Sequence, residues 1–539
     1  MCLIVPLTHS NIPIQSYICM EKRNVEKVGK WVISPLADHH WKKPQKRHIL
    51  PLLHGSGKMK KLVIADIPDI IHDLADLAEY HGYTIYVVGG YVRDRILGID
   101  SKDIDFTVVG DALEFARLVA AAKHSKAVIY ERFRTALVPV GDYLLEFVGT
   151  RKEEYLEHSR KPIVTEGSFE DDINRRDFTV NCMALSLKKE SFGEVIDLHD
   201  GQTDLANRIL RTPLDPMITF SDDPLRMMRA ARFSARLECD IEPETKKAMS
   251  SMAERISIIS QERISDEFIS LLKARKPSIG LKILHETGLL AYVFPELERL
   301  SGIELMQVGE HGYAHKDVFL HTLQVLDNLC EMTDNVWLRF ATLMHDIAKP
   351  KTKKFIQGIG WSFHGHEELG ARWQAGIFRR MKLPLEYVSY VETLVRLHQR
   401  PMVLVDDGVT DSAIRRLAVH AGDSLDDLFL LCKADITTKN SKKAERYLRN
   451  YEKVYQKILD VRERDQLRAF QSPVRGEEIM ELCSLQPSPA IGYIKHMIEE
   501  SILEGIIPND YQAAKQLLLD NKEQWLEEAK LYKKTQSIN

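Results

Sequence analysis

The chain of 539 residues is 44% apolar and 28% charged, with a formal net charge of −4, the composition of an ordinary soluble globular protein of several domains. No uninterrupted apolar stretch approaches the roughly 18 residues that a membrane helix requires, and the balanced charge means that any nucleic-acid surface must be local. The seven cysteines include no CxxC pair, which argues against a disulfide scaffold or a zinc ribbon and favours a reducing cytoplasm.

The first 58 residues differ from the rest of the chain because they carry little hydrophobic periodicity and several His, Pro and Lys residues. A signal peptide needs a compact apolar core after a basic start, and this stretch lacks one. We therefore predict an atypical extension over residues 1–58, disordered or spurious, with Met59 as the native start. The alternative is a basic RNA-binding arm formed by Lys42, Lys43, Lys46 and Arg47.

Residues 59–200 alternate between helix and strand patterns and predict a mixed α/β head. An amphipathic pattern predicts a helix in the segment IADIPDIIHDLADLAEYHG, which leads into the apolar strand TIYVV. The further predicted elements are a strand at DIDFTVV, a helix near 112–122, and strands around AVIYERF, TALVPVG and YLLEFVGT. The polar segment 151–167 is predicted to be a mobile loop over the cleft.

After residue 212 the patterns become helical almost without exception. We expect a helical neck over 201–300, a block over 301–441 that holds most of the histidines, and a helical tail over 442–539. From residue 472 onward, the tail is predicted to form shorter helices broken by Pro and Gly. The predicted fold class is therefore α+β, with a mixed-sheet head followed by an all-α body.

The first candidate site is formed by Asp103 and Asp105, which follow a Gly89–Gly90 turn. On an extended strand, side chains at i and i+2 leave the same face about 6–7 Å apart. Two such carboxylates can hold a pair of divalent cations for in-line phosphoryl transfer. The glycines let the backbone approach a phosphate, and Arg93 adds a forked cation. A solvated loop is the alternative explanation for an Asp-x-Asp beside a turn.

Two further motifs combine charge with helical spacing. In EDDINRRDFTVNCMAL, acidic residues precede Arg175, Arg176 and Asp177, and a charged helix start before a core helix would look the same. In SDDPLRMMRAARFSARL, helical spacing predicts that four side chains share one face, and a solvated or salt-bridged surface is the alternative. These four are Asp223, Arg226, Arg229 and Arg232.

A fourth constellation has the order H…HD…D: His321, the adjacent His345 and Asp346, and Asp435. Imidazole and carboxylate groups suit divalent transition metals or magnesium. The order resembles the HD phosphohydrolase domain, and this resemblance implies a metal site, with or without catalysis. Three more histidines are candidate ligands for a second metal: His364, His366 and His398.

Over residues 60–539, these motifs resemble the class II tRNA CCA-adding nucleotidyltransferases and bacterial poly(A) polymerases, with an added HD domain. Asp222 replaces the Glu that usually opens the EDxxR motif of that family. The resemblance implies a polymerase-β-like head in which Asp103 and Asp105 are catalytic and bind Mg²⁺, with Glu146 as a candidate third carboxylate or as an ordinary strand residue. The implied nucleotide-binding residues are Gly89, Gly90, Arg93, Arg176, Asp223, Arg226, Arg229 and Arg232, with Asn181 as a neighbour.

The implied activity is addition or repair of the 3′-terminal CCA of tRNA from CTP and ATP, with the tRNA acceptor arm held by the helical body. Cytosine and adenine both present an amine beside a ring acceptor, so an Asp that accepts and an Arg that donates can select them without a template strand. Uracil and guanine would leave buried groups unpaired, and such a site can discriminate by about 10⁴–10⁵. No obligate protein partner is indicated, and the oligomeric state stays open.

Three alternatives to full CCA addition remain at this point. The same chemistry fits an enzyme that adds only CC, only A or a poly(A) tail. A hydrolase that uses the HD site on RNA phosphoesters is a second alternative, and the two activities can coexist. An RNA-binding protein without catalysis is a third, although the intact pair of aspartates argues against it.

Overall fold

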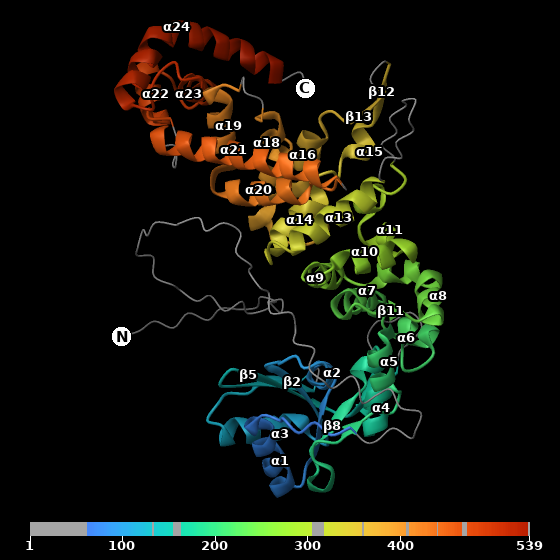
Figure 1. Ribbon diagram of the computed structural model, residues 1–539. Helices are drawn as coiled ribbons and strands as arrows, with labels where there is room; N and C mark the ends of the chain where they lie inside the picture. Colours follow the sequence, from blue (N-terminus) through green and yellow to red (C-terminus); the bar gives the residue numbers. More distant parts are fainter. Residues whose placement is uncertain are drawn as a thin grey trace, which may run out of the picture. The chain divides into compact units, whose positions relative to one another are not determined.

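A computed structural model of the protein describes residues 62–131, 134–154, 163–303, 317–357, 360–405, 409–438, 440–465 and 472–536. The predicted extension over residues 1–58 therefore lies outside the described residues. The predicted α+β class is confirmed, since a sheet-containing head is followed by helices (Figure 1). Within the described ranges, no helix combines the length and the apolar character needed to cross a membrane.

The head is built on a seven-stranded mixed sheet with the strand order β3-β4-β5-β2-β1-β8-β9. Strand β2 lies at its centre, antiparallel to β1 and parallel to β5. The strands are β1 (Thr84–Val88), β2 (Asp103–Val109), β3 (Val128–Tyr130), β4 (Thr135–Val140), β5 (Tyr143–Gly149), β8 (Ala184–Ser186) and β9 (Val195–Ile196). The central place of β2 fixes the position of the two predicted catalytic aspartates.

The first three helices along the chain belong to the head: α1 (Asp69–His81), α2 (Gly90–Ile96) and α3 (Ala112–Ala122). Helix α1 starts only after Pro68, whose extended ψ of 144° cannot be helical, so the predicted helix begins later than its apolar pattern does. It ends at Gly82 with φ of 74°, the left-handed conformation that glycine supplies at helix ends. Helix α3 begins where Asp111 accepts hydrogen bonds from two backbone amides.

The segment 151–167, predicted to be a loop, forms strands at both ends, so that prediction is wrong for the part described. Strands β6 (Arg151–Glu154) and β7 (Ile163–Glu166) pair in antiparallel register. The run Ile-Val-Thr in β7 has the β-branched composition that favours a strand over a loop. Residues 155–162 lie outside the described part of the chain.

The neck begins with short helices and then packs longer ones against each other. Helix α7 contacts both α9 and α10. The helices of the neck are α5 (Gly201–Asn207), α6 (Pro216–Asp222), α7 (Leu225–Leu237), α8 (Pro243–Ser251), α9 (Gln261–Leu272), α10 (Pro277–Glu286), α11 (Leu289–Val293) and α12 (Pro295–Glu298), and α4 (Phe169–Asn174) precedes them in the head. Two short strands, β10 (Ile209–Leu210) and β11 (Asp240–Ile241), pair in parallel between them.

The predicted shared helix face of Asp223 and Arg226 is wrong. Asp223 has extended φ and ψ of −139° and 99° and lies in the break between α6 and α7. Pro224 causes this break, because a proline disfavours helical conformation in the residue before it. Arg226, in contrast, lies in the first turn of α7.

In its described residues, the histidine-rich block is helical apart from one antiparallel hairpin of β12 (Lys354–Ile356) and β13 (Gly360–Ser362). Its helices are α13 (Val318–Cys330), α14 (Val336–Met344), α15 (Lys349–Thr352), α16 (His366–Arg380), α17 (Val388–Leu397), α18 (Arg400–Val403), α19 (Asp411–Ala421) and α20 (Leu425–Ala434). Helices α13, α14, α17 and α20 contact one another and carry most of the candidate metal ligands at or just beyond their ends.

The C-terminal part consists of α21 (Ser441–Asp465), α22 (Gly476–Cys483), α23 (Pro489–Leu503) and α24 (Tyr511–Gln536). The last three bury their own apolar cluster, which includes Ile494, Ile498 and Trp525. The prediction of short helices here is wrong for α24, because no Pro or Gly interrupts its 26 residues.

Candidate functional site

Three carboxylates lie together at the start of β2. Asp103 and Asp105 are its first and third residues, and Asp105 pairs in register with Glu146 of the parallel strand β5. Paired residues of neighbouring strands leave the same face of a sheet, so these two side chains are neighbours. Burial raises the pKa of Asp105, and burial together with Asp105 raises the pKa of Glu146. A bound cation would relieve this repulsion, so the three groups fit a divalent metal site.

The turn beside the carboxylates requires glycine. Gly89 has φ of 72°, a conformation that other residues rarely adopt, and it directly precedes α2. A Cβ atom at this position would lie 3.1 Å from Nη1 of Arg176 and 3.9 Å from Oδ2 of Asp105. The bare backbone of Gly89 and Gly90 therefore keeps open the space beside the carboxylates.

Arg176 reaches the same place from the second motif. Its Nη2 donates to Oδ2 of the buried Asp172 at 3.1 Å and to Oγ1 of Thr107 at 3.4 Å. Its Nε is buried and has no hydrogen-bond partner within the described structure. Nη1 of Arg176 is the atom that faces the Gly89 turn, so the guanidinium places a positive charge beside Asp105 that can attract a phosphate oxygen.

Arg93 is buried and its guanidinium is committed to side chains of the protein. Its Nε donates to Asp94 at 2.8 Å, and its Nη1 donates to Oδ1 of Asn181 at 2.5 Å. Asn181 donates in turn to Oδ1 of Asp177 at 3.0 Å, and Oδ2 of Asp177 accepts from Nε of Arg229 at 2.8 Å. One chain of hydrogen bonds thus links the first three sequence motifs.

Arg229 and Arg232 of α7 are ion-paired, which agrees with the alternative prediction of a salt-bridged surface. Nε of Arg232 lies 2.6 Å from Glu267 of α9, and Nη1 of Arg229 lies 3.5 Å from the same carboxylate. Both guanidinium groups also lie over the ring of Phe233, at 5.4 Å for Arg229 and 4.2 Å for Arg232. The sequence does not single out Glu267, because one glutamate in an amphipathic helix looks like any solvated side chain.

Asp223 and Arg226 bind different partners. Oδ1 of Asp223 accepts from the amide of Leu225 at 3.1 Å, and its Oδ2 pairs with Nη2 of Arg263 at 3.0 Å. Arg226 donates to the carbonyl oxygens of Thr219 at 3.3 Å and of Arg175 at 2.5 Å. The half-exposed Arg263 therefore occupies the second carboxylate oxygen of Asp223.

We predict that Asp177→Asn lowers the free energy of unfolding by about 2–3 kcal/mol. This loss is smaller than for a fully buried ion pair, because Arg229 still pairs with Glu267 and is partly exposed to solvent. Burial raises the pKa of Asp177, but Arg229 and Asn181 outweigh it and bring the pKa to about 2. Since the folded-state pKa is depressed, the stabilisation is complete above about pH 4 and disappears as the pH falls towards 2. The urea unfolding curves of the variant and the wild type should therefore differ most near neutral pH.

The control for this variant is Asp142→Asn, at an exposed residue of the same head. It should unfold like the wild type at every pH. A variant at Asp177 that matches the wild type at pH 7 would show that the hydrogen-bond chain does not stabilise the junction of head and neck.

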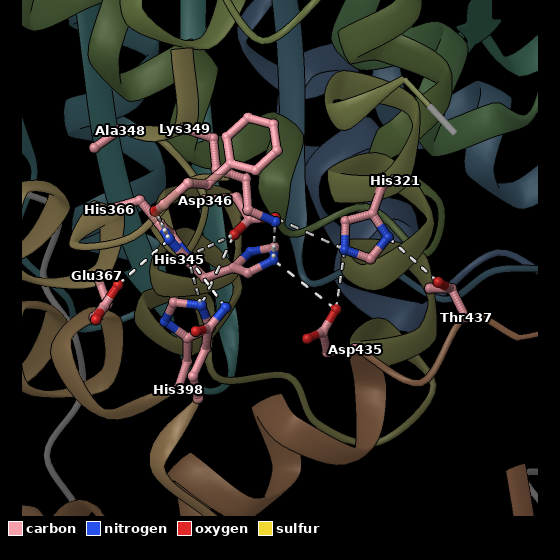
Figure 2. Close-up of polar contacts among 12 residues, drawn as sticks. His321, His345, Asp346, Ala348, Lys349, His366, Glu367, His398, Asp435 and Thr437 are labelled. Carbon is pink, nitrogen blue, oxygen red and sulfur yellow. Dashed lines mark hydrogen bonds and ion pairs between the residues drawn. The ribbon is translucent and has the colours of Figure 1, made fainter. Parts of the chain in front are cut away.

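The histidine-rich block brings its four predicted ligands together (Figure 2). Nε2 of His321 lies 3.0 Å from Oδ1 of Asp435, and Nε2 of His345 lies 3.1 Å from Oδ2 of Asp346. Across the group, His321 is 3.8 Å from Asp346 and His345 is 4.0 Å from Asp435. The residues come from the ends of α14 and α20 and from within α13.

Two further histidines join the other oxygen of Asp346. Nε2 of His366 lies 3.3 Å and Nε2 of His398 lies 3.8 Å from Oδ1 of Asp346, and these two nitrogens are 3.4 Å apart. The possible ligands therefore form two groups of three: His321 with His345 and Asp435, and Asp346 with His366 and His398. Oδ2 of Asp346 also faces the first group. His364 is exposed and belongs to neither group, unlike the prediction that it adds a ligand.

Backbone contacts fix which ring nitrogens face the cluster. The Nδ1 atoms of His345, His366 and His398 lie 2.6, 2.8 and 2.6 Å from the carbonyl oxygens of Thr342, Phe363 and Val395. A ring that donates from Nδ1 presents the lone pair of Nε2, the form that binds metals. Burial, with His345 nearby, lowers the pKa of His398 to about 3, so this ring is neutral at pH 7.

Two atoms of the cluster are buried without a hydrogen-bond partner in the described structure: Nε2 of His345 and Oδ1 of Asp346. Buried polar groups are normally satisfied, so orphaned atoms require an explanation. A divalent cation would satisfy both, and the donor set of imidazole and carboxylate suits one. The residues present thus fit a metal centre.

Comparison with known proteins connects these two sites to one family. The "Poly A polymerase head domain" model matches residues 85–211, the "Probable RNA and SrmB- binding site of polymerase A" model matches 239–300, and the HD domain model matches 318–440. The first model contains the three carboxylates and the third contains all six clustered ligands.

Relatives match over most of their length. An A-adding tRNA nucleotidyltransferase of Deinococcus radiodurans is 30% identical over 436 residues, which cover 79% of this chain and 93% of that protein. A multifunctional CCA protein of Ralstonia nicotianae is 30% identical over 368 residues, 66% of this chain and 82% of that protein. The fold is that of the Thermotoga maritima CCA-adding enzyme, solved in complex with tRNA, with a TM-score of 0.52 at 19% identity over 85% of this chain and 96% of that one. The chain therefore belongs to the tRNA nucleotidyltransferase family of transferases.

Proposed function

We propose that the protein is a CTP- and ATP-dependent nucleotidyltransferase that builds or repairs the 3′-terminal CCA of tRNA and releases pyrophosphate. The observation that carries the proposal is the group of three carboxylates on the neighbouring strands β2 and β5, beside the Gly89 turn and the guanidinium of Arg176. The relatives with A-adding and CCA names support the substrate class.

In the proposed mechanism, Asp103 and Asp105 hold Mg²⁺ and Glu146 supports Asp105. Bound there, Mg²⁺ would lower the pKa of the primer hydroxyl and neutralise charge on the departing pyrophosphate. Gly89 lets phosphate oxygens approach the backbone, and Arg176 donates to them. Most of the rate enhancement would come from positioning and from electrostatic stabilisation in this site.

We assign the remaining predicted residues to placing the nucleotide, directly or through neighbours. Gly90 keeps the turn open, and Arg93 acts as a positioning residue because its donors hold Asp94 and Asn181. Arg229 and Arg232 orient α7 through Glu267. Asp223 would accept from the base amine after Arg263 moves aside, and Arg226 fixes the break that presents Asp223.

For the rest of the chain we propose a head over 59–200, a neck over 201–300, an HD domain over 301–441 and an RNA-binding tail over 442–539. The predicted tail residue Lys495 lies 3.8 Å from Glu499. A better basic surface lies on α21, where five exposed side chains follow helical spacing along one face: Lys442, Arg446, Arg449, Lys453 and Lys457. Such a stripe suits the phosphate backbone of a tRNA.

The proposed setting is the cytoplasm, which suits the five described cysteines, all free.

The experiment that tests full CCA addition compares product lengths on three tRNA transcripts, ending before the first C, after C and after CC. Each should be extended to the same terminal A. If only one or two of the transcripts are extended to the terminal A, full CCA addition is refuted, and the products show which nucleotides the enzyme adds.

As a second function, we propose that the HD site hydrolyses phosphoesters. The observation that favours it is the six-ligand cluster, in which Nε2 of His345 and Oδ1 of Asp346 are buried and make no hydrogen bond of good geometry within the described structure. Water activated on a divalent metal is the usual nucleophile at such sites. The six residues would hold metal as two groups of three, with Asp346 in the group that contains His366 and His398.

We predict that His345→Ala lowers the metal content of the HD domain and reduces hydrolysis of bis(p-nitrophenyl) phosphate by about 100-fold or more, since even residues that only support a metal ligand cost 10–100-fold. Nucleotide addition should stay within about twofold of wild type. The matched control is His364→Ala, because His364 is exposed and outside the cluster. Undiminished hydrolysis in the His345 variant would remove the hydrolase proposal.

A further inference from the structure

The β12–β13 hairpin connects two members of the HD cluster. Along the chain it follows Asp346 and α15, and it ends just before His366. Oγ1 of Thr352 lies 3.3 Å from the carbonyl oxygen of Phe363, and the same carbonyl accepts from Nδ1 of His366 at 2.8 Å. The base of the hairpin therefore contacts the ring of a candidate metal ligand.

Two large aromatic side chains are exposed on this hairpin. Phe355 and Trp361 are partners in the strand register, and their side chains are 59% and 39% exposed. Their rings stand edge to face, with centroids 5.4 Å apart. A paired aromatic surface in water loses hydrophobic stabilisation that burial would provide, so its exposure calls for a partner that covers it.

The same hairpin is strongly basic. Lys351 and Lys354 are exposed, and Nζ of Lys353 lies 4.6 Å from the centroid of the Trp361 ring. Residues 351–362 contain no acidic side chain. Aromatic faces for unstacked bases, interleaved with cations for the backbone, are the combination that binds single-stranded nucleic acid. Duplex bases are already stacked and could not use these faces.

We propose that Phe355 and Trp361, with Lys351, Lys353 and Lys354, form a stacking platform for the single-stranded end of an RNA. The platform holds that end so that its terminal phosphoester reaches the HD cluster. Trp361 precedes Phe363 by two residues, about 7 Å along an extended strand, which places the platform next to the His366 side of the cluster. The role of the phosphoester rests on the proposed hydrolase function, whereas RNA binding by the platform does not.

The first test is independent of catalysis. A single-stranded RNA oligonucleotide that carries 4-thiouridine near its 3′ end is photo-crosslinked to the full-length protein, and the crosslinked peptides are mapped by mass spectrometry. We expect crosslinks within residues 351–363, and a loss of about tenfold or more in the double variant Phe355→Ala/Trp361→Ala, because each stacked base contributes substantially to affinity. The controls are Phe355→Tyr/Trp361→Tyr, which keeps both faces, and Tyr292→Ala, an exposed aromatic on α11.

The second test separates this proposal from the hydrolase proposal. The double alanine variant should raise KM for an RNA with a 3′-terminal phosphoester by about tenfold or more, with turnover of bis(p-nitrophenyl) phosphate and CCA addition unchanged. Crosslinks at the hairpin without any hydrolysis would refute the hydrolase and keep the platform. Crosslinking equal to wild type in the double variant would overturn the platform. The platform would also be overturned if the double variant lost binding to phosphatidylglycerol vesicles but bound RNA like the wild type.

Discussion

Asp105→Ala is expected to reduce nucleotide incorporation into tRNA by about 10³-fold or more, since metal ions supply several kcal/mol of transition-state stabilisation and each 1.4 kcal/mol is tenfold in rate. The register places Asp105 between Asp103 on its own strand and Glu146 on the next. Removal of the central carboxylate should therefore leave the remaining pair too far apart to hold two cations. The measurement is incorporation of labelled CTP in the presence of Mg²⁺.

The variant should fold like the wild type. Burial and the neighbouring Asp103 raise the pKa of Asp105, so its charged form is disfavoured in the folded protein, and its loss should not lower the melting temperature. Asp142→Ala, at an exposed position of the head, is the matched control and should keep full activity. Full incorporation by Asp105→Ala would refute the metal role of this residue.

Asp223→Ala is expected to relax base choice more than it slows the chemistry. Loss of the acceptor for the base amine should lower the preference for CTP over UTP by about 10- to 100-fold, because an unmatched buried polar group costs roughly 1–3 kcal/mol. Asp223→Asn is the sharper variant. It keeps one oxygen for the amide of Leu225 but turns the other acceptor into a donor, which suits the carbonyl of uracil.

Kinetic constants for all four nucleoside triphosphates, measured on a tRNA ending at the position of the first C, give the discrimination directly. Arg263→Ala is the companion variant, since Arg263 occupies Oδ2 of Asp223 without nucleotide. It should weaken discrimination less than either change at Asp223. If both Asp223 variants keep the wild-type preference, this residue does not read the base.

The head could be predicted largely from local patterns. The strand TIYVV, the strand that carries the two aspartates, and the helix over 112–122 all have a clear apolar period, and each lies where it was predicted. The break in the helix at Asp223 was not predicted, because Asp223 continues the three-residue spacing of the α7 arginines, although Pro224 separates it from the helix. The strands β6 and β7 were not predicted, because charged residues dominate the segment and conceal the short β-branched run of β7, although the two strands pair locally with each other.

The site shows the same limit. The four HD residues could be predicted from their order, and His366 and His398 were candidates, but sequence spacing could not tell the buried His366 from the exposed His364 two residues earlier. The pairing of Asp105 with Glu146 depends on the order of strands in the sheet, which periodicity does not determine. The partner Glu267 was not recognised, because one acidic residue in a helix has no distinctive pattern. Asp172 was not singled out, because the sequence does not tell it from the adjacent Glu170 and Asp171.

The most direct test of the central claim uses wild-type protein and a tRNA transcript that ends at its discriminator base, with Mg²⁺ and all four nucleoside triphosphates. Sequencing of the product ends should reveal C, C and A in that order, followed by a stop. Products that carry U or G as often as C or A, or a transcript left unextended, would contradict the claim that these carboxylates join nucleotides chosen by the protein itself.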